Sequence, residues 1–319
     1  MLTKLILERF KNFKKAELAL GPVASLIGTN ASGKSNIRDA FRFLHGIGRG
    51  YTLAEIMGEK YGEGGELQWK GIRGGTLEST YLKAKTFRLS IKFYYDPSPD
   101  FFPEKTVNVV YSIEIESGPT IDRPQVTQES LYADNIMIFD SHPFENPPDQ
   151  NNPQNLAVKL YGELLETFDV HQPMLIQIPE RIEKRHKNGI PLTFGEPIKF
   201  GEPVILGKSI DFGKPLITEK PSVSEKQKAY RKGIPIELFQ VIGRTTDTLQ
   251  SMRFFVLDPQ AMRLPSFPGQ TVLGDRGENL SSVLQAICEE QQQKQALLEW
   301  IRELTPMDAS DFEFVPDQT

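Results

Sequence analysis

The chain has 319 residues, a formal net charge of -5, 39% hydrophobic residues and 25% charged residues. These values are typical of a globular protein and argue against a surface that is basic throughout, as a general nucleic-acid coat would need. The single cysteine, Cys288, cannot form an internal disulfide, and the four histidines lack zinc-ligand spacing. No run approaches the roughly 20 apolar residues of a membrane span, so we expect a cytoplasmic protein.

The N-terminal region alternates apolar and polar residues on either side of residues 11–14, which predicts two short strands joined by a turn. The apolar run Val23–Ile27 then has the profile of a buried strand that ends at Gly28. Apolar residues follow at i, i+3, i+4 and i+7 and predict an amphipathic helix from Ser35 to about His45. These four are Ile37, Ala40, Phe41 and Leu44.

A glycine-rich loop, Gly28–Ser35, stands between the predicted strand and the predicted helix and reads GTNASGKS. Backbone N–H groups in such a loop can surround a triphosphate, while the helix that begins there presents its positive dipole end. Lys34 is placed to reach the β and γ phosphates, and Ser35 to offer its hydroxyl to Mg²⁺. We therefore predict that ATP and Mg²⁺ bind here. The predicted nucleotide-binding residues are Gly28, Asn30, Ala31, Ser32, Gly33, Lys34, Ser35 and Asn36.

The middle of the chain predicts mainly strands. Residues 46–75 are rich in glycine and indicate a loop with one short helix near Leu53–Met57. Alternation then predicts an antiparallel hairpin from residues 87–95 and 107–115, followed by strands near 126–132 and 136–139. Residues 141–155 indicate a loop, and the pattern of 156–168 predicts a helix.

A repeat with a period of six residues occupies the stretch 191–220, with Phe-Gly-Glu-Pro twice among its units. Stacked repeats need about three neighbouring units to bury a core. The repeat therefore indicates either a poorly ordered insertion or a short β-prism piece. Beyond it we expect helices at 236–249, 280–287 and 297–304, a buried strand at Phe254–Leu257 and a last strand at 312–315.

The N-terminal run 5–14, the strand before the glycine loop, and Asn30 and Asn36 together resemble the ATPase heads of RecF, SMC and Rad-type repair proteins. The resemblance extends to bacterial AAA-family ATPases of that ABC-like class, through segments 258–265 and 274–280. It implies an α/β fold: a P-loop NTPase with an ABC-ATPase-like head, an inserted antiparallel β lobe, and an incomplete C-terminal end. It also implies a head-to-head homodimer, or a partner that supplies the missing half, with ATP between the heads and DNA as a further ligand.

The chain departs from that family in its catalytic motifs. Neither a Leu-Ser-x-Gly signature nor an apolar strand ending in Asp-Glu is found. Asp140 and Asp258 each end an apolar run and could contact Mg²⁺, but neither has the adjacent carboxylate, and a strand-end cap is the structural alternative. We therefore expect the N-terminal portion of a longer ATPase, or one half of a split one.

Two further features each have a functional and a structural interpretation. Gln128 lies where the family's Q-loop would fall, which implies a Mg²⁺ contact; a polar residue on a strand surface is the alternative. The basic residues of segment 181–187 could follow a phosphate backbone, although short charge runs are usually solvated.

We expect four regions: 1–45 with the glycine loop, 46–140 with the β lobe, 141–235 with the repeat, and 236–319 as the remainder of the head. The leading hypothesis is an ATP-binding portion of an ABC/RecF-like ATPase in DNA repair or in defence against foreign DNA. Hydrolysis would then need the motifs that are missing here. The alternatives are a small-molecule kinase with a lid in residues 46–75 and a catalytically inactive nucleotide-sensing module.

Overall fold

The computed structural model describes residues 1–96, 106–119, 121, 123–143, 156–160, 163–187, 236–306 and 308–315. They belong to two compact units, Met1–Met252 and Arg253–Thr319. The predicted hexad repeat and most of the predicted loop 141–155 lie outside the described residues.

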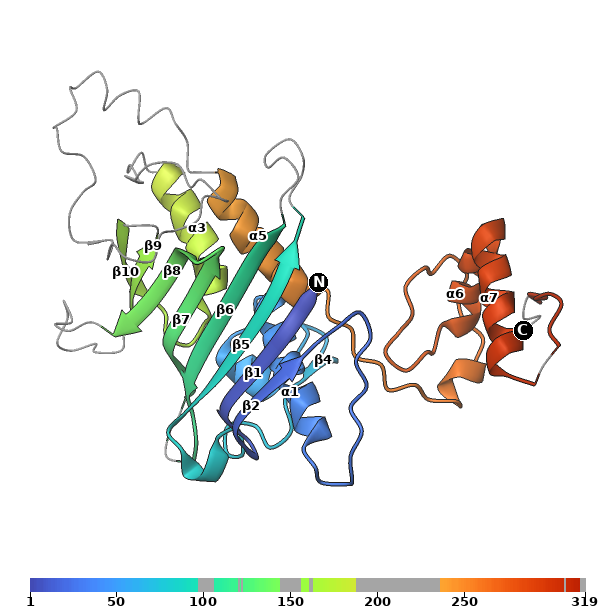
Figure 1. The fold of residues 1–319 in the computed structure, drawn as a ribbon, viewed down its shortest axis with the longest axis horizontal. Helices are drawn as coiled ribbons and strands as arrows, with labels where there is room; N and C mark the ends of the chain where they lie inside the picture. The colour runs from blue at the N-terminus through green and yellow to red at the C-terminus, as the bar shows by residue number, and fades with distance from the viewer. Residues whose placement is uncertain are drawn as a thin grey trace, which may run out of the picture. The chain divides into compact units, whose positions relative to one another are not determined.

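The first unit is built on one sheet of eight strands in the order β10-β9-β8-β7-β6-β5-β1-β2 (Figure 1). Every neighbouring pair is antiparallel. The strands are β1 (Leu2–Phe10), β2 (Phe13–Ala19), β5 (Thr86–Tyr95), β6 (Val107–Glu116), β7 (Gln125–Ala133), β8 (Ile136–Pro143), β9 (Leu156–Leu160) and β10 (Glu163–Phe168). The predicted N-terminal hairpin, the hairpin of β5 with β6, and strands β7 and β8 are thereby confirmed. Because this sheet contains strands from three of the four predicted regions, their boundaries do not separate compact units.

Alternation along the strands gives this sheet one apolar face and one polar face. Three helices cover the apolar face: α1 (Lys34–Gly48), α3 (Met174–Lys187) and α5 (Ile236–Gln250). Phe87 of β5 packs against Phe10 and Phe43, with ring centroids 5.2 and 5.5 Å apart. The predicted helices at 35–45 and 236–249 are confirmed, and α1 is held by its buried stripe, since Phe43, Leu44 and Ile47 are fully buried.

The glycine-rich stretch after α1 is more ordered than predicted. Helix α2 (Leu53–Met57) is confirmed and begins with a capping box, in which Thr52 and Glu55 exchange side-chain to backbone hydrogen bonds. Strands β3 (Glu59–Tyr61) and β4 (Leu67–Lys70) then form a small antiparallel pair where a loop was expected. The turn η1 (Tyr81–Lys83) precedes β5.

The helix predicted at residues 156–168 is wrong, because this segment forms β9 and β10. Its leucine spacing satisfies a helical period, but Leu156, Val158 and Leu160 also alternate as in a strand, and all three are buried. The open edge of β8 supplies hydrogen-bond partners for the backbone of β9. The sequence of this segment fits the helical period and the strand period about equally well. Pairing with the edge of the sheet therefore selects the strand.

The buried strand predicted at Val23–Ile27 is also wrong. The segment is irregular, and the side chains of Val23 and Ile27 are 87% and 95% exposed. A buried strand needs neighbours that pair with its backbone and cover both faces. Among the described residues, no strand lies beside it.

The second unit contains the turn η2 (Ala261–Arg263) and the helices α6 (Leu280–Glu289) and α7 (Gln291–Leu304), which confirm the two predicted helices. The buried strand predicted at Phe254–Leu257 is wrong: the segment is irregular and Val256 is 59% exposed. Its backbone hydrogen bonds go to a segment further along the same unit, from Val256 N–H to Asp275 O at 2.8 Å and from Asp258 N–H to Arg276 O at 2.9 Å. The strand expected at 312–315 is irregular as well.

None of the helices in the described ranges is long and apolar enough to cross a bilayer.

Candidate functional site

The glycine loop ends at the N-terminus of α1, and its backbone has the left-handed turns that such a loop needs. Gly33 is the N-cap of α1 with φ 97°, and Ala31 has φ 64°. Glycine adopts positive φ without strain, whereas Ala31 does so at a cost. The first amides of a helix have no intrahelical acceptor, so those of Lys34 and Ser35 are available to an anion.

Lys34 folds back over the loop that precedes it. Its Nζ donates to the carbonyl oxygens of Gly28 and Thr29 at 2.6 and 2.7 Å, and approaches Ser32 Oγ at 3.4 Å. Lys34 therefore contacts its own loop here, whereas the sequence predicts that it reaches the β and γ phosphates of a bound nucleotide. Ser35, the predicted Mg²⁺ contact, is exposed at the start of α1.

Close packing explains why Gly33 carries no side chain. A Cβ at Gly33 would lie 2.7 Å from Phe13 Cζ and 2.8 Å from Asn12 Nδ2. At Gly28, by contrast, the nearest atom to a Cβ would be Ser32 Oγ at 2.8 Å, which can rotate away. Gly33 is thus covered by the turn between β1 and β2, which places that turn against the loop.

Three further residues lie beside the loop: Lys11 and Asp39, which were not anticipated from the sequence, and Arg73, which the sequence offered as an arginine of the lid in the kinase alternative. Asp39 lies in α1 with its side chain only 3% exposed, and it pairs with both cations. One signal was available, because Asp39 falls on the same helical stripe as Phe43 and Ile47, at i+4 and i+8. The partners come from distant segments, so spacing could not have identified them.

The structure does not bring Gln128 to the loop. In β7, Gln128 Oε1 accepts a hydrogen bond from Arg88 Nη2 at 2.8 Å, on the polar face of the sheet. Helix α1 packs on the opposite face. Gln128 and Ser35 are therefore separated by the sheet and cannot share one Mg²⁺, which removes the predicted metal role of Gln128.

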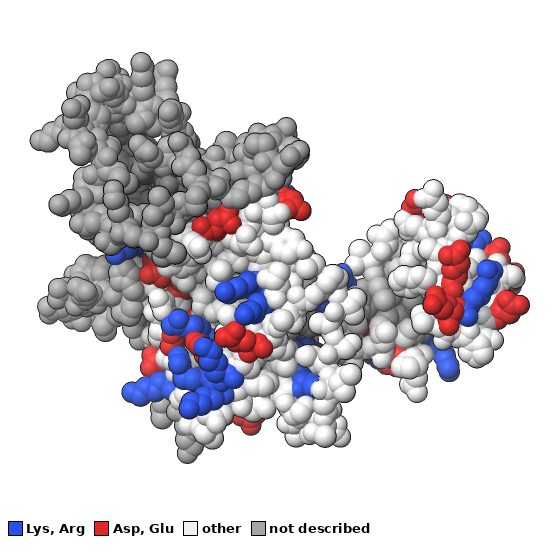
Figure 2. All heavy atoms as spheres, viewed as in Figure 1, with Lys and Arg blue, Asp and Glu red and all other residues white. Residues whose placement is uncertain are grey.

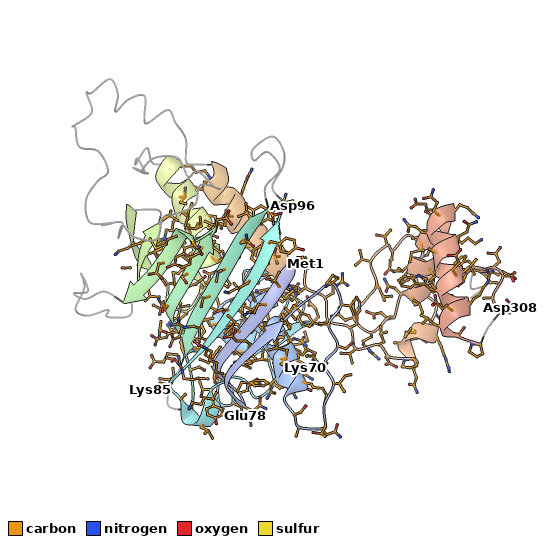
Figure 3. The ribbon with its side chains drawn as sticks, in the orientation of Figure 1. Met1, Lys70, Glu78, Lys85, Asp96 and Asp308 are labelled. Carbon is orange, nitrogen blue, oxygen red and sulfur yellow. The ribbon has the colours of Figure 1, made fainter. Side chains whose placement is uncertain are left out.

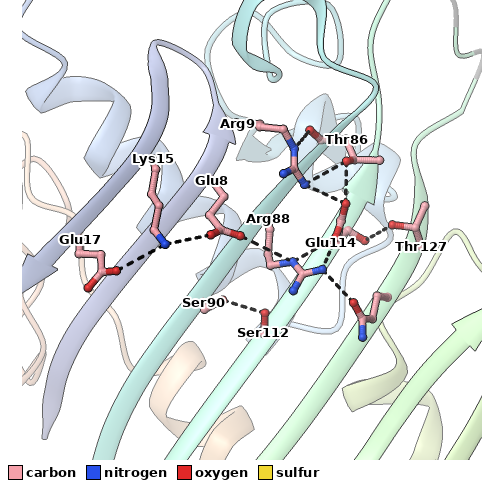
Figure 4. Close-up of polar contacts among 11 residues, drawn as sticks. Glu8, Arg9, Lys15, Glu17, Thr86, Arg88, Ser90, Ser112, Glu114 and Thr127 are labelled. Atoms are coloured by element: carbon pink, nitrogen blue, oxygen red, sulfur yellow. Dashed lines mark hydrogen bonds and ion pairs between the residues drawn. The ribbon is translucent and has the colours of Figure 1, made fainter.

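The polar face around Gln128 carries a ladder of alternating charges across four strands (Figure 4). Glu114 accepts from Arg9, Arg88 and Thr86, and Lys15 bridges Glu8 and Glu17. Burial raises the pKa of Glu114, but hydrogen bonds from Thr86 and Arg88 outweigh it and lower the pKa overall. Figure 2 shows both signs of charge close together on the visible face of this unit. The ladder is internally neutralised, as a solvated sheet face should be.

The two aspartates weighed as Mg²⁺ partners have other contacts. Asp140 Oδ1 lies 3.5 Å from Gln128 Nε2, on the ladder. Asp258 is in the second unit, where its hydrogen bond from Arg276 and the bond from the Gln260 amide lower its pKa. No cluster of three or more His, Cys, Asp or Glu suited to a metal occurs within the described residues. Asp258 is thus the partner in an ion pair, and Asp140 contacts the side chain of a neighbouring strand.

The basic segment 181–187 lies on α3 and is largely paired. Lys184 and Lys187 contact Glu180 and Glu183 at i–4, at 3.9 and 2.6 Å. The guanidinium of Arg181 lies over the Phe168 ring, 5.6 Å from its centroid. These contacts favour the solvated-helix interpretation of this run.

One family model matches a part of the chain that includes the glycine loop. Residues 23–147 match the family model described as "AAA domain, putative AbiEii toxin, Type IV TA system". No curated protein matches the chain. A solved structure described as "Structural biochemistry of ATP-driven dimerization and DNA stimulated activation of SMC ATPases" is 24% identical, over 43% of this chain and 70% of its own. Its TM-score of 0.25 is too low to support an inference about fold or function.

The family match begins just before the glycine loop and includes α1 and strands β5 to β8. The predicted relation to AAA-family ATPases agrees with this match, which describes residues 23–147 as an AAA domain.

Proposed function

We propose that the loop Gly28–Ser35 binds Mg-ATP and that the chain is the nucleotide-binding portion of an ABC/RecF-like ATPase. The observation that carries this proposal is the geometry at the start of α1: a left-handed Gly33, free helix amides and the folded Lys34. These groups fit a triphosphate, because they offer N–H donors and one ammonium. Bound Mg²⁺ would supply charge neutralisation of the phosphates, with the Ser35 hydroxyl as its protein contact.

Binding is expected to exceed catalysis. Phosphoryl transfer in such sites depends on positioning of water and on neutralisation of charge. The sequence contains neither the signature motif nor the Asp-Glu strand that would supply these, and no cluster of three or more His, Cys, Asp or Glu lies within the described residues. We therefore expect micromolar affinity for Mg-ATP and turnover close to background for this chain alone.

The test is a titration of Mg-ATP into the purified chain. Replacing Lys34 by alanine removes charge-assisted contacts to the phosphates, so we expect the Kd to rise roughly 10- to 100-fold. Lys92→Ala, on the exposed part of β5, is the matched control and should leave the Kd unchanged. Unchanged affinity in Lys34→Ala would refute the assignment of the loop.

We further propose a cytoplasmic role in defence against foreign DNA rather than in repair. The family description supports this choice, because it names a toxin system. ATP-dependent association of two copies is the accompanying proposal. Light scattering with and without a non-hydrolysable ATP analogue tests it, and a monomer under both conditions would count against association.

A further inference from the structure

A continuous polar network runs from the interior of α1 to the glycine loop. Arg73 Nε and Nη2 donate to Asp39 Oδ2 at 3.0 and 2.8 Å, and Nη2 also donates to Asn36 Oδ1 at 2.9 Å. Asn36 Nδ2 in turn donates to Asn12 Oδ1 at 2.8 Å. Asn12 is the residue whose amide lies against Gly33. Three side chains, those of Arg73, Asn36 and Asn12, therefore connect the buried Asp39 carboxylate to Gly33, the N-cap of α1.

Asp39 is the fixed end of this network. Its side chain is 3% exposed, and Lys11 Nζ, on a side chain that is 7% exposed, approaches the same Oδ2 at 3.2 Å. A buried carboxylate needs such partners, since an unpaired buried charge costs several kcal/mol. Lys11 Nζ also donates to the carbonyl oxygen of Arg73. Asp39 thus ties the β1–β2 turn and the segment after β4 to α1.

Arg73 is the solvent-exposed end of this network. Its side chain is 52% exposed, and it comes from the segment between β4 and η1. This segment and the β1–β2 turn meet at one end of the sheet, because Lys11 N–H donates to Ser79 O at 2.9 Å. Figure 3 marks that end with Glu78 and Lys85, opposite Met1 and Asp96.

The directions of these hydrogen bonds show how Arg73 fixes the side chains beside the loop. Arginine has no acceptor, so its contact fixes the Asn36 amide with the oxygen toward Arg73 and the NH₂ toward Asn12. Asn12 Oδ1 is then occupied, which holds the Asn12 side chain against Gly33. In this arrangement, Asn36 supports the loop from behind instead of facing a nucleotide with its amide.

We propose that Arg73 is a positioning residue for the glycine loop, acting through Asn36 and Asn12 with Asp39 as its anchor. This inference rests on the proposed function, because its consequence is measured as ATP affinity. Arg73 orders the loop before nucleotide arrives, and a preorganised loop loses less conformational freedom on binding.

A double-mutant cycle on Mg-ATP affinity tests this inference in the full chain. Arg73→Met and Asn36→Ala should each weaken binding about tenfold, and the double variant should also lose about tenfold rather than a hundredfold. Residues that act through one another give such non-additive effects, whereas independent contacts to the ligand add. Arg49→Met, at the other end of α1 and exposed, is the matched control and should bind as the wild type does.

Arg73→Lys guards against misfolding of the methionine variant. Lysine keeps the charge but reaches only one of the two acceptors, so we expect an intermediate Kd. Additive losses in the cycle, or an unchanged Kd in Arg73→Met, would overturn the inference while Lys34→Ala still loses affinity. If wild-type protein binds no ATP, or Lys34→Ala binds normally, the proposed function itself fails.

Discussion

Glu129 is a carboxyl group with no exposed surface, in the middle of β7. It accepts hydrogen bonds from the amides of Met174 and Leu175 at 2.6 and 2.9 Å, and from Tyr111 Oη at 2.9 Å. It thereby caps the N-terminus of α3. Burial raises the pKa of Glu129 to about 7, because the cost of desolvating its charge exceeds the gain from these three bonds.

The stability of the first unit should therefore depend on pH in a definite direction. The pKa of Glu129 is higher in the folded chain than in the unfolded one, so its contribution is complete below about pH 4.5 and is lost as the pH rises through about 7. The shift corresponds to roughly 3 kcal/mol. Chemical denaturation between pH 5 and 8 should show this fall in the free energy of unfolding. Glu129→Gln, which cannot ionise, should flatten that slope, and an equal slope in both proteins would contradict the assignment.

At the scale of single residues, the sequence predicted the loop better than its surroundings. Gly28, Gly33 and Lys34 are recognisable because their roles depend on spacing within one short segment. Arg73 and Asp39 are 34 positions apart and meet only after folding. Gln128 shows the opposite error: its position along the chain suited a Mg²⁺ contact, but the alternation of β7 turned it to the other face of the sheet.

The contact between α1 and α5 depends on a glycine in the first helix. A Cβ at Gly48 would lie 2.4 Å from the Gln250 amide nitrogen and 2.7 Å from Leu249 Cβ. The backbone of Leu249 and Gln250 could move away from this Cβ only if helix α5 moved with it. In α5 itself, Gly243 has nothing within 4 Å of an added Cβ.

These two glycines predict opposite effects of the same substitution. Gly48→Ala should destabilise the chain by about 1–3 kcal/mol, since it overpacks the helix contact. Gly243→Ala should stabilise it by about 0.5–1 kcal/mol, because alanine loses less backbone entropy in a helix. Urea denaturation of the two variants gives the comparison, and a stabilised Gly48→Ala would refute the packing argument.

Elements were predictable where one period dominated. Strands β5 and β6 alternate over ten residues each, and α1 repeats its apolar stripe over four turns. Residues 156–168 fit both a helical and a strand period, and pairing with the edge of β8 favoured the strand. Val23–Ile27 has the local pattern of a buried strand, but burial depends on flanking strands, which a local pattern does not reveal.

Across the whole molecule, each unit exposes apolar residues. Val23 and Ile27 do so in the first unit, and Phe267 (85%) and Trp300 (66%) in the second. Such exposure contributes nothing to folding of the chain, because transfer free energy is gained only when apolar area leaves water.

Ile27→Ala should therefore leave the free energy of unfolding within about 0.5 kcal/mol of wild type. Leu7→Ala, at a fully buried position of β1, should cost roughly 2–5 kcal/mol. Denaturant midpoints measure both. A loss in Ile27→Ala comparable with that in Leu7→Ala would show that the Val23–Ile27 segment is buried in solution.

Because Lys34 folds back, the carbonyl groups of the loop compete with the phosphates of a nucleotide for its ammonium group. The ammonium already holds two backbone carbonyls, so an arriving triphosphate gains this cation only by displacing Gly28 and Thr29 from it. The measured free energy of binding is the difference between the free energies of these two sets of contacts. Release of a lysine from such exposed contacts takes only picoseconds to nanoseconds, so this competition lowers the affinity for nucleotide and leaves the association rate to diffusion.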